Sequence, residues 1–171
     1  LEVIQVKNWK HADPWTITVK PSPNLPNDQA IRLYPSTGVF EGTNMSVGRG
    51  TQMPFQVLGH PDLKAQPFSF TPVSIDGMSK NPIYEGKVCY GIDLRNVTPQ
   101  RKIDLKYLIS MYKAFPDKEK FFNANNFDRH LGTSSVRLQV IQGASEEAIR
   151  NGWQKDLEAY HVIRNKYLLY P

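Results

Sequence analysis

The apolar pattern of this chain changes near residue 100, and the change limits the folds that the sequence can adopt. Before that point, apolar segments are short and are separated by prolines, glycines and other turn residues. Short strands divided by turns are typical of an antiparallel sheet or a small barrel. After it, apolar residues recur at helical spacing. Strands followed by helices predict an α+β domain, with an antiparallel or barrel-like sheet covered on one side by three C-terminal helices.

The expected strands are short runs of β-branched, aromatic or alternating apolar residues. In the last of them, apolar side chains at every second position from Val88 to Leu94 share one face, and Cys89 points to the other face as a buried thiol. Cys89 is the one cysteine of the chain, so no intrachain disulfide can form. The predicted strands comprise residues 1–10, 16–19, 39–40, 53–57, 68–75 and 88–94.

The expected helices are defined by apolar spacing and by capping residues. A short helix begins at Asn27 or Asp28 and ends at Pro35. The three C-terminal helices run through residues 108–115, from Ser134 or Ser135 to Ile141, and from Ser145 through a buried stripe of Ile149, Trp153, Leu157 and Tyr160. The closing residues, 167–171, form an apolar tail that we expect to pack back on the domain.

Two loops concentrate polar groups. The glycine-rich segment, residues 39–51, holds one carboxylate, one amide, one guanidinium and three hydroxyls among three glycines. Glycine lets a backbone approach a ligand closely, so the segment fits a binding loop, and it fits a polar hairpin turn equally well. The proline-rich loop, residues 20–26, is stiffened by three prolines and can hold Ser22 and Asn24 in fixed positions, although a plain connector has the same composition.

Several common sites are absent from the sequence. The four histidines are far apart, and none belongs to an HxH or HxxxH pair, so no metal site is predicted. The chain has no P-loop and no G-x-S-x-G elbow. Gly48-Arg49-Gly50 lacks the third glycine of a dinucleotide fingerprint.

Carboxylates remain as candidates, because cleavage of a glycosidic bond usually uses two of them. Glu41 is the one acid of the glycine-rich segment, and the possible second carboxylates are Asp76, Asp93 and Asp128. Arg49 could bind a substrate carboxylate through two hydrogen bonds, or it could pair with Glu41 and fix the loop. The sequence leaves both roles open.

Charge and hydropathy limit the partners. The formal net charge is +5 and the isoelectric point is about 9.3. Lysines and arginines do not cluster, so no nucleic-acid surface is predicted, although a diffuse positive field favours anionic partners. No apolar run reaches the length of about 18 residues that indicates a transmembrane helix.

An ordered set of motifs runs through nearly the whole chain. The motifs are PSPNLP at 21–26, LYP at 33–35, FEGTN at 40–44, GRGT at 48–51, PF at 54–55, FTP at 70–72, LG at 131–132, and a Trp153 helix followed by YLLY at 167–170. As a set, they resemble the C-terminal half of the bacterial exo-β-N-acetylmuramidases, long catalogued only as a domain of unknown function.

The resemblance implies that residues 1–171 form a single domain of a two-domain protein. A Rossmann-like N-terminal domain, absent from this sequence, would precede it, and the active site would lie in the cleft between the two. The implied reaction releases N-acetylmuramic acid from the non-reducing ends of peptidoglycan fragments without a cofactor. The family is exported to the bacterial cell envelope, so a periplasmic or secreted location is expected. Because the principal catalytic carboxylate belongs to the missing domain, this piece is expected to be inactive alone.

The resemblance also implies site residues. Ser22 and Asn24 match the proline-rich motif, and Glu41, Asn44 and Arg49 match the glycine-rich motif. Ser22, Asn24, Asn44 and Arg49 are expected to bind substrate, with Arg49 on the anionic lactyl group of muramic acid. Glu41 is the candidate catalytic residue, or it holds the loop instead.

An alternative function is a non-catalytic module that binds carbohydrate or peptidoglycan. The basic isoelectric point and the two tryptophans near loop ends, Trp9 and Trp15, motivate this alternative. Exposed tryptophan rings can provide stacking surfaces for sugars.

Overall fold

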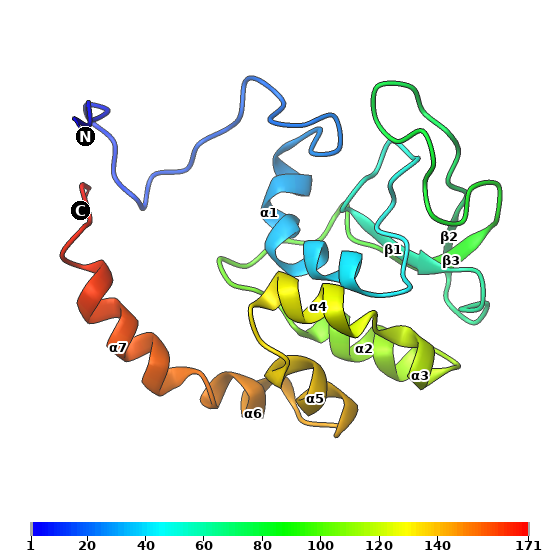
Figure 1. The fold of residues 1–171 in the computed structure, drawn as a ribbon. Helices are drawn as coiled ribbons and strands as arrows, with labels where there is room; N and C mark the ends of the chain where they lie inside the picture. Colours follow the sequence, from blue (N-terminus) through cyan, green and yellow to red (C-terminus); the bar gives the residue numbers. More distant parts are fainter. Residues whose placement is uncertain (1, 171) are drawn as a thin grey trace.

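The computed structural model describes residues 2–170. This part of the chain contains a small antiparallel sheet and seven α-helices, which confirms the predicted α+β class (Figure 1). The strands are β1 (Val57–His60), β2 (Phe68–Phe70) and β3 (Cys89–Asp93). The helices are α1 (Asp28–Thr37), the 3-10 helix η1 (Gly38–Gly42), α2 (Lys106–Ala114), α3 (Lys118–Phe121), α4 (Ala124–Leu131), α5 (Ser135–Ile141), α6 (Glu146–Asn151) and α7 (Gln154–Arg164).

The sheet has the order β1-β3-β2, so β3 is central and pairs with both neighbours in antiparallel register. Leu58 lies opposite Ile92, and Ser69 lies opposite Tyr90. Every residue of β1 is buried. Helices α2 and α3 run along one side of the sheet, and the long loop between β2 and β3 lies on the other side (Figure 1).

A single large hydrophobic cluster joins the helices to the sheet. It extends from Leu33 in α1 to Ile149 in α6 and contains the side chains of α2, α4 and α5 that face inward. Helix α4 packs very closely on η1: a Cβ added to Gly42 would lie 2.4 Å from the Cα of Phe127. The glycine at position 42 therefore permits contact between two backbones.

Several local predictions are confirmed. The side chain of Asn27 caps α1 by accepting a hydrogen bond from the amide of Ala30, and Ser145 caps α6 in the same way through Ala148. The predicted stripe of α2 is buried at Leu108 and Met111. Cys89 is a fully buried strand thiol, and burial raises its pKa to about 11.

The strands predicted in the first half of the chain are partly wrong. Residues 2–10 and 16–19 form no strand, because they meet no partner strand within the described residues. The strand predicted at 53–57 begins only at Val57, since Phe55 has a φ of 60°, which a strand does not accommodate. The strand predicted at 68–75 ends at Phe70, two residues before Pro72, which has no N–H for the ladder.

Pro35 does not end the first helix. Helix α1 continues to Thr37 and leads directly into η1. Pro35 lies in the last turn of α1, so its missing N–H removes only one hydrogen bond near the helix end. The prediction that this proline terminates the helix is therefore wrong.

The C-terminal third differs most from the prediction. Two further helices, α3 and α4, occupy a segment where no helix was predicted, and the last predicted helix is two helices, α6 and α7. Of the predicted stripe, Ile149 is buried, whereas Leu157 is 44% exposed and Tyr160 is 57% exposed. None of the residues of α7 is buried. No helix in residues 2–170 combines the length and apolar character needed to cross a membrane.

Candidate functional site

The glycine-rich segment is neither a strand end nor a hairpin turn. Its first residues form η1, so the strand predicted at residues 39–40 is wrong, and the segment then crosses beside β1 through a bridge between Ser46 and Gly59. The close packing of Gly42 on α4 favours the helical path over an extended one, because a strand would carry the chain away from this contact.

The hydroxyls of this segment are used internally. Thr43 Oγ1 donates to the carbonyl of Phe40 at 2.7 Å, and Thr51 Oγ1 donates to that of Gly48 at 2.7 Å. Ser46 Oγ accepts a hydrogen bond from the amide of Gly48. These hydroxyls fix the backbone. Within residues 39–51, the three residues that are not fully buried are the acid, the amide and the base, namely Glu41, Asn44 and Arg49.

Glu41 and Arg49 form an ion pair. Arg49 Nε donates to Glu41 Oε1 at 2.8 Å, and both side chains are partly exposed. Within residues 2–170, Nε makes the only side-chain hydrogen bond of Arg49, so the two terminal guanidinium nitrogens can donate to a ligand. Glu41 thus orients the guanidinium but uses only one of its three nitrogens. Arg49 can therefore pair with Glu41 and bind a ligand carboxylate at the same time.

The aromatic ring of Phe55 packs against the guanidinium of Arg49. The guanidinium carbon of Arg49 lies 5.1 Å from the centre of the Phe55 ring, a cation–π distance. Phe55 is buried and packs edge-on against Tyr34 at 4.8 Å. Its φ of 60° is rare for a bulky residue, and such backbone strain concentrates at functional sites. The strained turn places an aromatic ring under the one arginine of the glycine-rich segment.

Residues 73–86, which we call the covering loop, close over the glycine-rich segment. The amide of Val73 donates to the carbonyl of Gly50 at 2.8 Å, and Tyr84 Oη donates to that of Asn44 at 2.8 Å. Gly50 has a φ of 80°, and a Cβ added there would lie 2.6 Å from Pro82. The sequence does not predict this loop as part of the site, because its residues carry no motif of their own.

A cavity of about 220 Å³ lies between the glycine-rich segment and the covering loop. Glu41 and Arg49 line it from one side, and Ser79 and Asn81 line it from the other; the remaining lining residues are Thr43, Met45, Val47, Pro82 and Ile83. The volume is below the range of about 300–1,000 Å³ that is usual for a ligand pocket. The cavity therefore has the size of part of a binding site.

The proline-rich loop meets the covering loop through Asn24. Asn24 Nδ2 donates to the carbonyl of Met78 at 3.0 Å, and the Asn24 amide donates to Ser22 Oγ at 3.2 Å. The Asn24 side chain is buried, and its Oδ1 has no partner in the described part of the chain. Ser22 and Asn24 thus lie together and hold the loop that lines the far side of the cavity.

Asn44 points away from this cavity. Its Nδ2 donates to the carbonyl of Lys120 in α3 at 2.6 Å, and its backbone amide donates to the carbonyl of Phe121. Among the predicted site residues, the structure therefore brings Glu41 and Arg49 together at the cavity and places Asn44 at the contact with α3.

Aromatic residues support the Tyr84 hydroxyl. Tyr84 packs edge-on against His60 at 4.8 Å, and His60 packs against Phe115 at 4.7 Å. Burial, with smaller effects from Cys89 and Asp62, raises the pKa of Tyr84 to about 12, so this hydroxyl remains a donor at neutral pH. Burial also lowers the pKa of His60, against the opposing effect of Asp62.

The other candidate carboxylates lie outside the cavity. Asp93 pairs with Arg95 at 2.7 Å, and Asp128 pairs with Arg137 at 2.7 Å. Hydrogen bonds from these arginines lower the pKa of both carboxyls. Asp76 is exposed and lies near Lys80. In residues 2–170, no group of three or more His, Cys, Asp or Glu side chains is placed to hold a metal ion.

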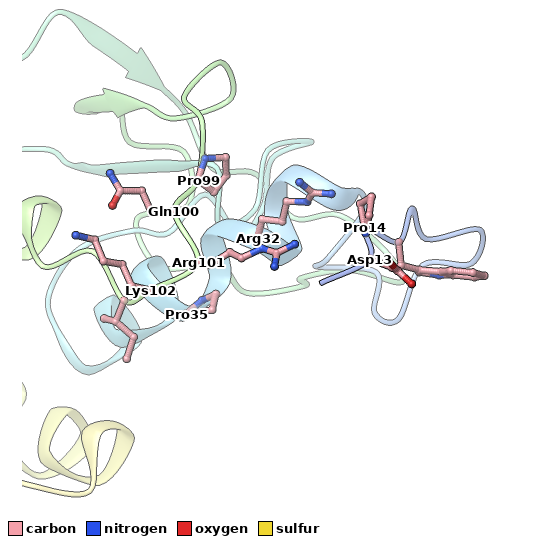
Figure 2. A pocket seen from close by; sticks show the side chains of 10 residues that line it. Asp13, Pro14, Arg32, Pro35, Pro99, Gln100, Arg101 and Lys102 are labelled. Carbon is pink, nitrogen blue, oxygen red and sulfur yellow. The ribbon is translucent and has the colours of Figure 1, made fainter. Parts of the chain in front are cut away.

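A larger cavity, of about 600 Å³, lies between the N-terminal segment and α1. It is lined by Asp13, Pro14, Trp15, Arg32, Pro35, Pro99, Gln100, Arg101, Lys102 and Ile103. Figure 2 shows these side chains spread along α1 and the neighbouring loop, with Asp13 far from Gln100 and Lys102. One wall consists of an exposed segment, so we do not regard this gap as the main site.

Comparisons with known proteins agree on one family. Residues 32–170 match the family described as "Exo-beta-N-acetylmuramidase NamZ, C-terminal". The chain is 31% identical to the peptidoglycan beta-N-acetylmuramidase NamZ of Bacillus subtilis (strain 168), over 99% of this chain and 45% of that protein.

Two solved structures are similar as well. A crystal structure of a DUF1343 family protein from Bacteroides fragilis NCTC 9343 matches with a TM-score of 0.90 and 42% identity, over 96% of this chain and 47% of that one. A second DUF1343 protein of the same organism, 19% identical with a TM-score of 0.66 over 90% of this chain and 45% of that one, shares the fold. The chain thus spans less than half the length of these relatives.

Proposed function

Because this chain belongs to the family of exo-β-N-acetylmuramidase NamZ C-terminal domains, we propose that it forms one wall of the substrate cleft of a peptidoglycan glycoside hydrolase. The whole enzyme releases N-acetylmuramic acid from the non-reducing ends of peptidoglycan fragments. The observation that carries the proposal is the Glu41–Arg49 pair at the mouth of a small cavity, with two guanidinium nitrogens left to donate.

Arg49 binds the anionic part of the substrate. The lactyl group distinguishes muramic acid from other amino sugars by its carboxylate, and a guanidinium can bind a carboxylate through two parallel hydrogen bonds. The Nε bond to Glu41 and the Phe55 ring hold the guanidinium in one orientation. Arg49 is therefore already ordered before the substrate binds, so binding costs little side-chain entropy at this position.

Glu41 has a positioning role in this proposal, since its carboxylate is already bonded to Arg49. Hydrolysis normally needs two carboxyl groups about 5–9.5 Å apart on either side of the scissile bond. Glu41 is the one acidic residue that lines the 220 Å³ cavity. The principal catalytic carboxylate then comes from a second, N-terminal domain, and the isolated chain binds substrate weakly and does not hydrolyse it.

Ser22, Asn24 and Asn44 contribute by fixing the walls. Asn24 links the proline-rich loop to the covering loop, and Asn44 links the glycine-rich segment to α3. The covering loop presents Ser79 and Asn81 to the same cavity as Arg49, so these two residues are additional candidates for contact with the sugar.

The test uses the longer protein that contains this chain and a chromogenic β-N-acetylmuraminide. Replacing Arg49 with alanine is expected to lower kcat/KM by about 10- to 100-fold, because hydrogen bonds to a charged group contribute about 1.5–3 kcal/mol. The same variant should lose little activity on any residual β-N-acetylglucosaminide substrate, which lacks the lactyl carboxylate. Lys64→Ala removes an equal charge at an exposed position and serves as the control.

Glu41→Gln separates positioning from catalysis. If Glu41 only orients Arg49, glutamine keeps the shape and lowers kcat/KM by about tenfold at most, whereas loss of a general acid or base costs about 10²–10⁴-fold. The alternative function, a binding module without chemistry, predicts saturable binding of muropeptides by the isolated chain and no hydrolysis by the longer protein. Unchanged kinetics in Arg49→Ala would contradict the role of Arg49.

We place the enzyme in the bacterial cell envelope, periplasmic or secreted, where peptidoglycan is present, with a role in cell wall recycling. Hydrolysis by carboxylates needs no cofactor, so activity should survive exhaustive treatment with a chelator. Fractionation of the source cells tests the location. Recovery of the enzyme only from the cytoplasm would contradict it.

A further inference from the structure

Helix α7 carries an apolar face that the rest of this chain does not cover. Trp153, Leu157 and Tyr160 recur at the helical spacing of a buried stripe, and Ile163 extends the stripe. In the structure, Leu157 is 44% exposed, Tyr160 is 57% exposed and Ile163 is 54% exposed. The sequence has the pattern of a packed helix, yet within residues 2–170 Trp153 packs against the hydrophobic cluster and the later residues of the stripe stay exposed.

The uncovered face continues into a groove. A hollow of about 410 Å³ lies along α7, and its apolar lining comes from four parts of the fold: Ile103, Leu131, Val136, Trp153, Leu157 and Tyr160. Thr133 and Asp156 complete the lining. A mostly apolar groove of this kind is an unusual feature for a surface in contact with water. Such a groove can accommodate apolar side chains of another domain or chain.

The N-terminal arm, residues 2–20, also exposes apolar side chains. It forms no helix or strand, and Ile4, Val6 and Trp15 are 91%, 65% and 68% exposed. The arm contacts the C-terminal tail: Tyr170 Oη accepts a hydrogen bond from the amide of Val6 at 2.9 Å, and its ring meets the Trp9 ring at 4.8 Å. A second apolar hollow, of about 400 Å³, is lined by Val6, Trp9, Trp15 and Tyr170.

The arm and α7 lie on the same side of the molecule. Figure 1 shows the arm leaving α1 and α7 leaving α6, and their ends meet away from the body of the domain. The two segments are therefore neighbours at their ends, where Val6 and Trp9 contact Tyr170.

A relative that contains more chain matches nearly all of this one. The Bacteroides fragilis structure with a TM-score of 0.90 covers 96% of this chain, so about 7 of 171 residues are unmatched, fewer than the 11 residues of α7 and fewer than the arm. The match accounts for only 47% of that relative. The match therefore includes residues of both the arm and α7, and the remaining half of the longer chain is available to cover them.

We infer that the arm and the α7 face together form the docking surface for the N-terminal domain of the same polypeptide. The inference rests on the two-domain part of the proposed function and adds the surface through which the domains join. Burial of this face holds the cleft in one geometry, because α7 follows α6 directly and α6 is bonded to the start of α2. Arg150 of α6 donates to Glu146 and to the carbonyl of Ile103, and Glu146 accepts a hydrogen bond from the amide of Leu105. The docking surface is thereby joined to the core that supports the glycine-rich segment.

Hydrogen exchange of the 171-residue chain and of the longer protein tests the inference. Amides of α7 should exchange at least tenfold more slowly in the longer protein, while amides of α2 and β3 exchange at similar rates in both. The double variant Leu157→Glu/Tyr160→Glu in the longer protein should restore fast exchange in α7. Gln154→Glu adds a negative charge to the polar side of the same helix and should leave the exchange slow.

Three results would overturn the inference. The first is equal exchange of α7 in the two proteins, and the second is slow exchange that survives the double variant. The third is a concentration-dependent dimer of the 171-residue chain that protects α7, which would assign the face to a second copy. None of these measurements depends on activity. Docking without release of N-acetylmuramic acid would refute the proposed function alone, and release without docking would refute this inference alone.

Discussion

Residues 39–51 and helix α7 differ sharply in burial. In the glycine-rich segment, every residue is buried except Glu41, Asn44 and Arg49, although the segment contains no regular strand or α-helix. Helix α7 is regular over 11 residues and has no buried residue. Regular secondary structure and participation in the core are therefore separate properties here.

The difference follows from what each segment contacts. The glycine-rich segment is enclosed by α4, β1 and the covering loop, and its backbone groups find partners on each of them. Helix α7 extends away from the body, and its backbone groups find their partners within the helix rather than on neighbouring segments. Four predictions test this contrast, from the largest expected effect to the smallest.

Gly42→Ala is expected to destabilise the domain most. The added Cβ would lie 2.4 Å from the Cα of Phe127, and neither backbone can move without disturbing the core. We expect a loss of about 3 kcal/mol or more in the free energy of unfolding, at the upper end for overpacked sites. Gly152→Ala, between α6 and α7, should change it by less than about 1 kcal/mol. If urea denaturation showed equal losses of stability for the two variants, the predicted difference between residues 39–51 and the α6–α7 region would be wrong.

Tyr84→Phe removes the hydroxyl that holds the carbonyl of Asn44. Because this bond ties the covering loop to the glycine-rich segment, its loss should lower the free energy of unfolding by about 1–2 kcal/mol. The matched substitution Tyr160→Phe removes a hydroxyl from an exposed ring of α7 and should have almost no effect. Thermal or urea unfolding of the two variants measures the difference directly.

The buried region should also respond to mild acid through His60. Burial lowers the pKa of His60 below the ordinary histidine value of about 6.5, and its Nδ1 accepts a hydrogen bond from the amide of Asp62, so the folded protein favours the neutral ring. The unfolded chain takes up a proton near pH 6.5, which stabilises it. The contribution of His60 is therefore complete above about pH 6.5 and is lost as pH falls toward the lowered pKa.

We expect the unfolding free energy to decrease as pH falls below about 6.5, and the decrease to be smaller in His60→Gln, which has no titrating ring. Urea denaturation at several pH values measures both curves. Parallel curves for the two proteins would show that other groups cause the pH dependence.

Leu157→Ala should have the smallest effect in the 171-residue chain. Leu157 is 44% exposed, so we expect a loss below about 1 kcal/mol, compared with about 2–5 kcal/mol for Leu108→Ala in the core. The comparison becomes sharper in the longer protein, where docking of α7 would raise the cost of Leu157→Ala toward that of a core leucine. A cost of several kcal/mol in the 171-residue chain would contradict the observed exposure.

Much of the local structure could be predicted because its causes are local. The caps at Asn27 and Ser145 use hydrogen bonds within three residues, and the stripe of α2 follows from helical spacing. The buried thiol of Cys89 follows from strand alternation. The segments that failed, such as residues 2–10, have strand-like composition but no partner within the described chain, and composition does not reveal a missing partner.

The candidate site was predicted in part. The sequence identified the glycine-rich and proline-rich segments and left open whether Arg49 pairs with Glu41 or binds a ligand. It did not find the covering loop, whose contacts join residues as distant as Tyr84 and Asn44. It also grouped Asn44 with Arg49, whereas the Asn44 side chain bonds to Lys120 in α3. The roles of the predicted residues in binding and catalysis stay predictions.

The sequence alone determined the α+β class, the helix caps and the family, because these depend on local spacing and on motifs that can be read along the chain. Only the tertiary structure decided which polar groups face a cavity and which apolar face is left uncovered. In the glycine-rich segment, the hydroxyls bond to nearby backbone, whereas Glu41 and Arg49 meet at 2.8 Å over the ring of Phe55. Such contacts depend on where distant segments come to lie, and spacing along the chain does not specify that.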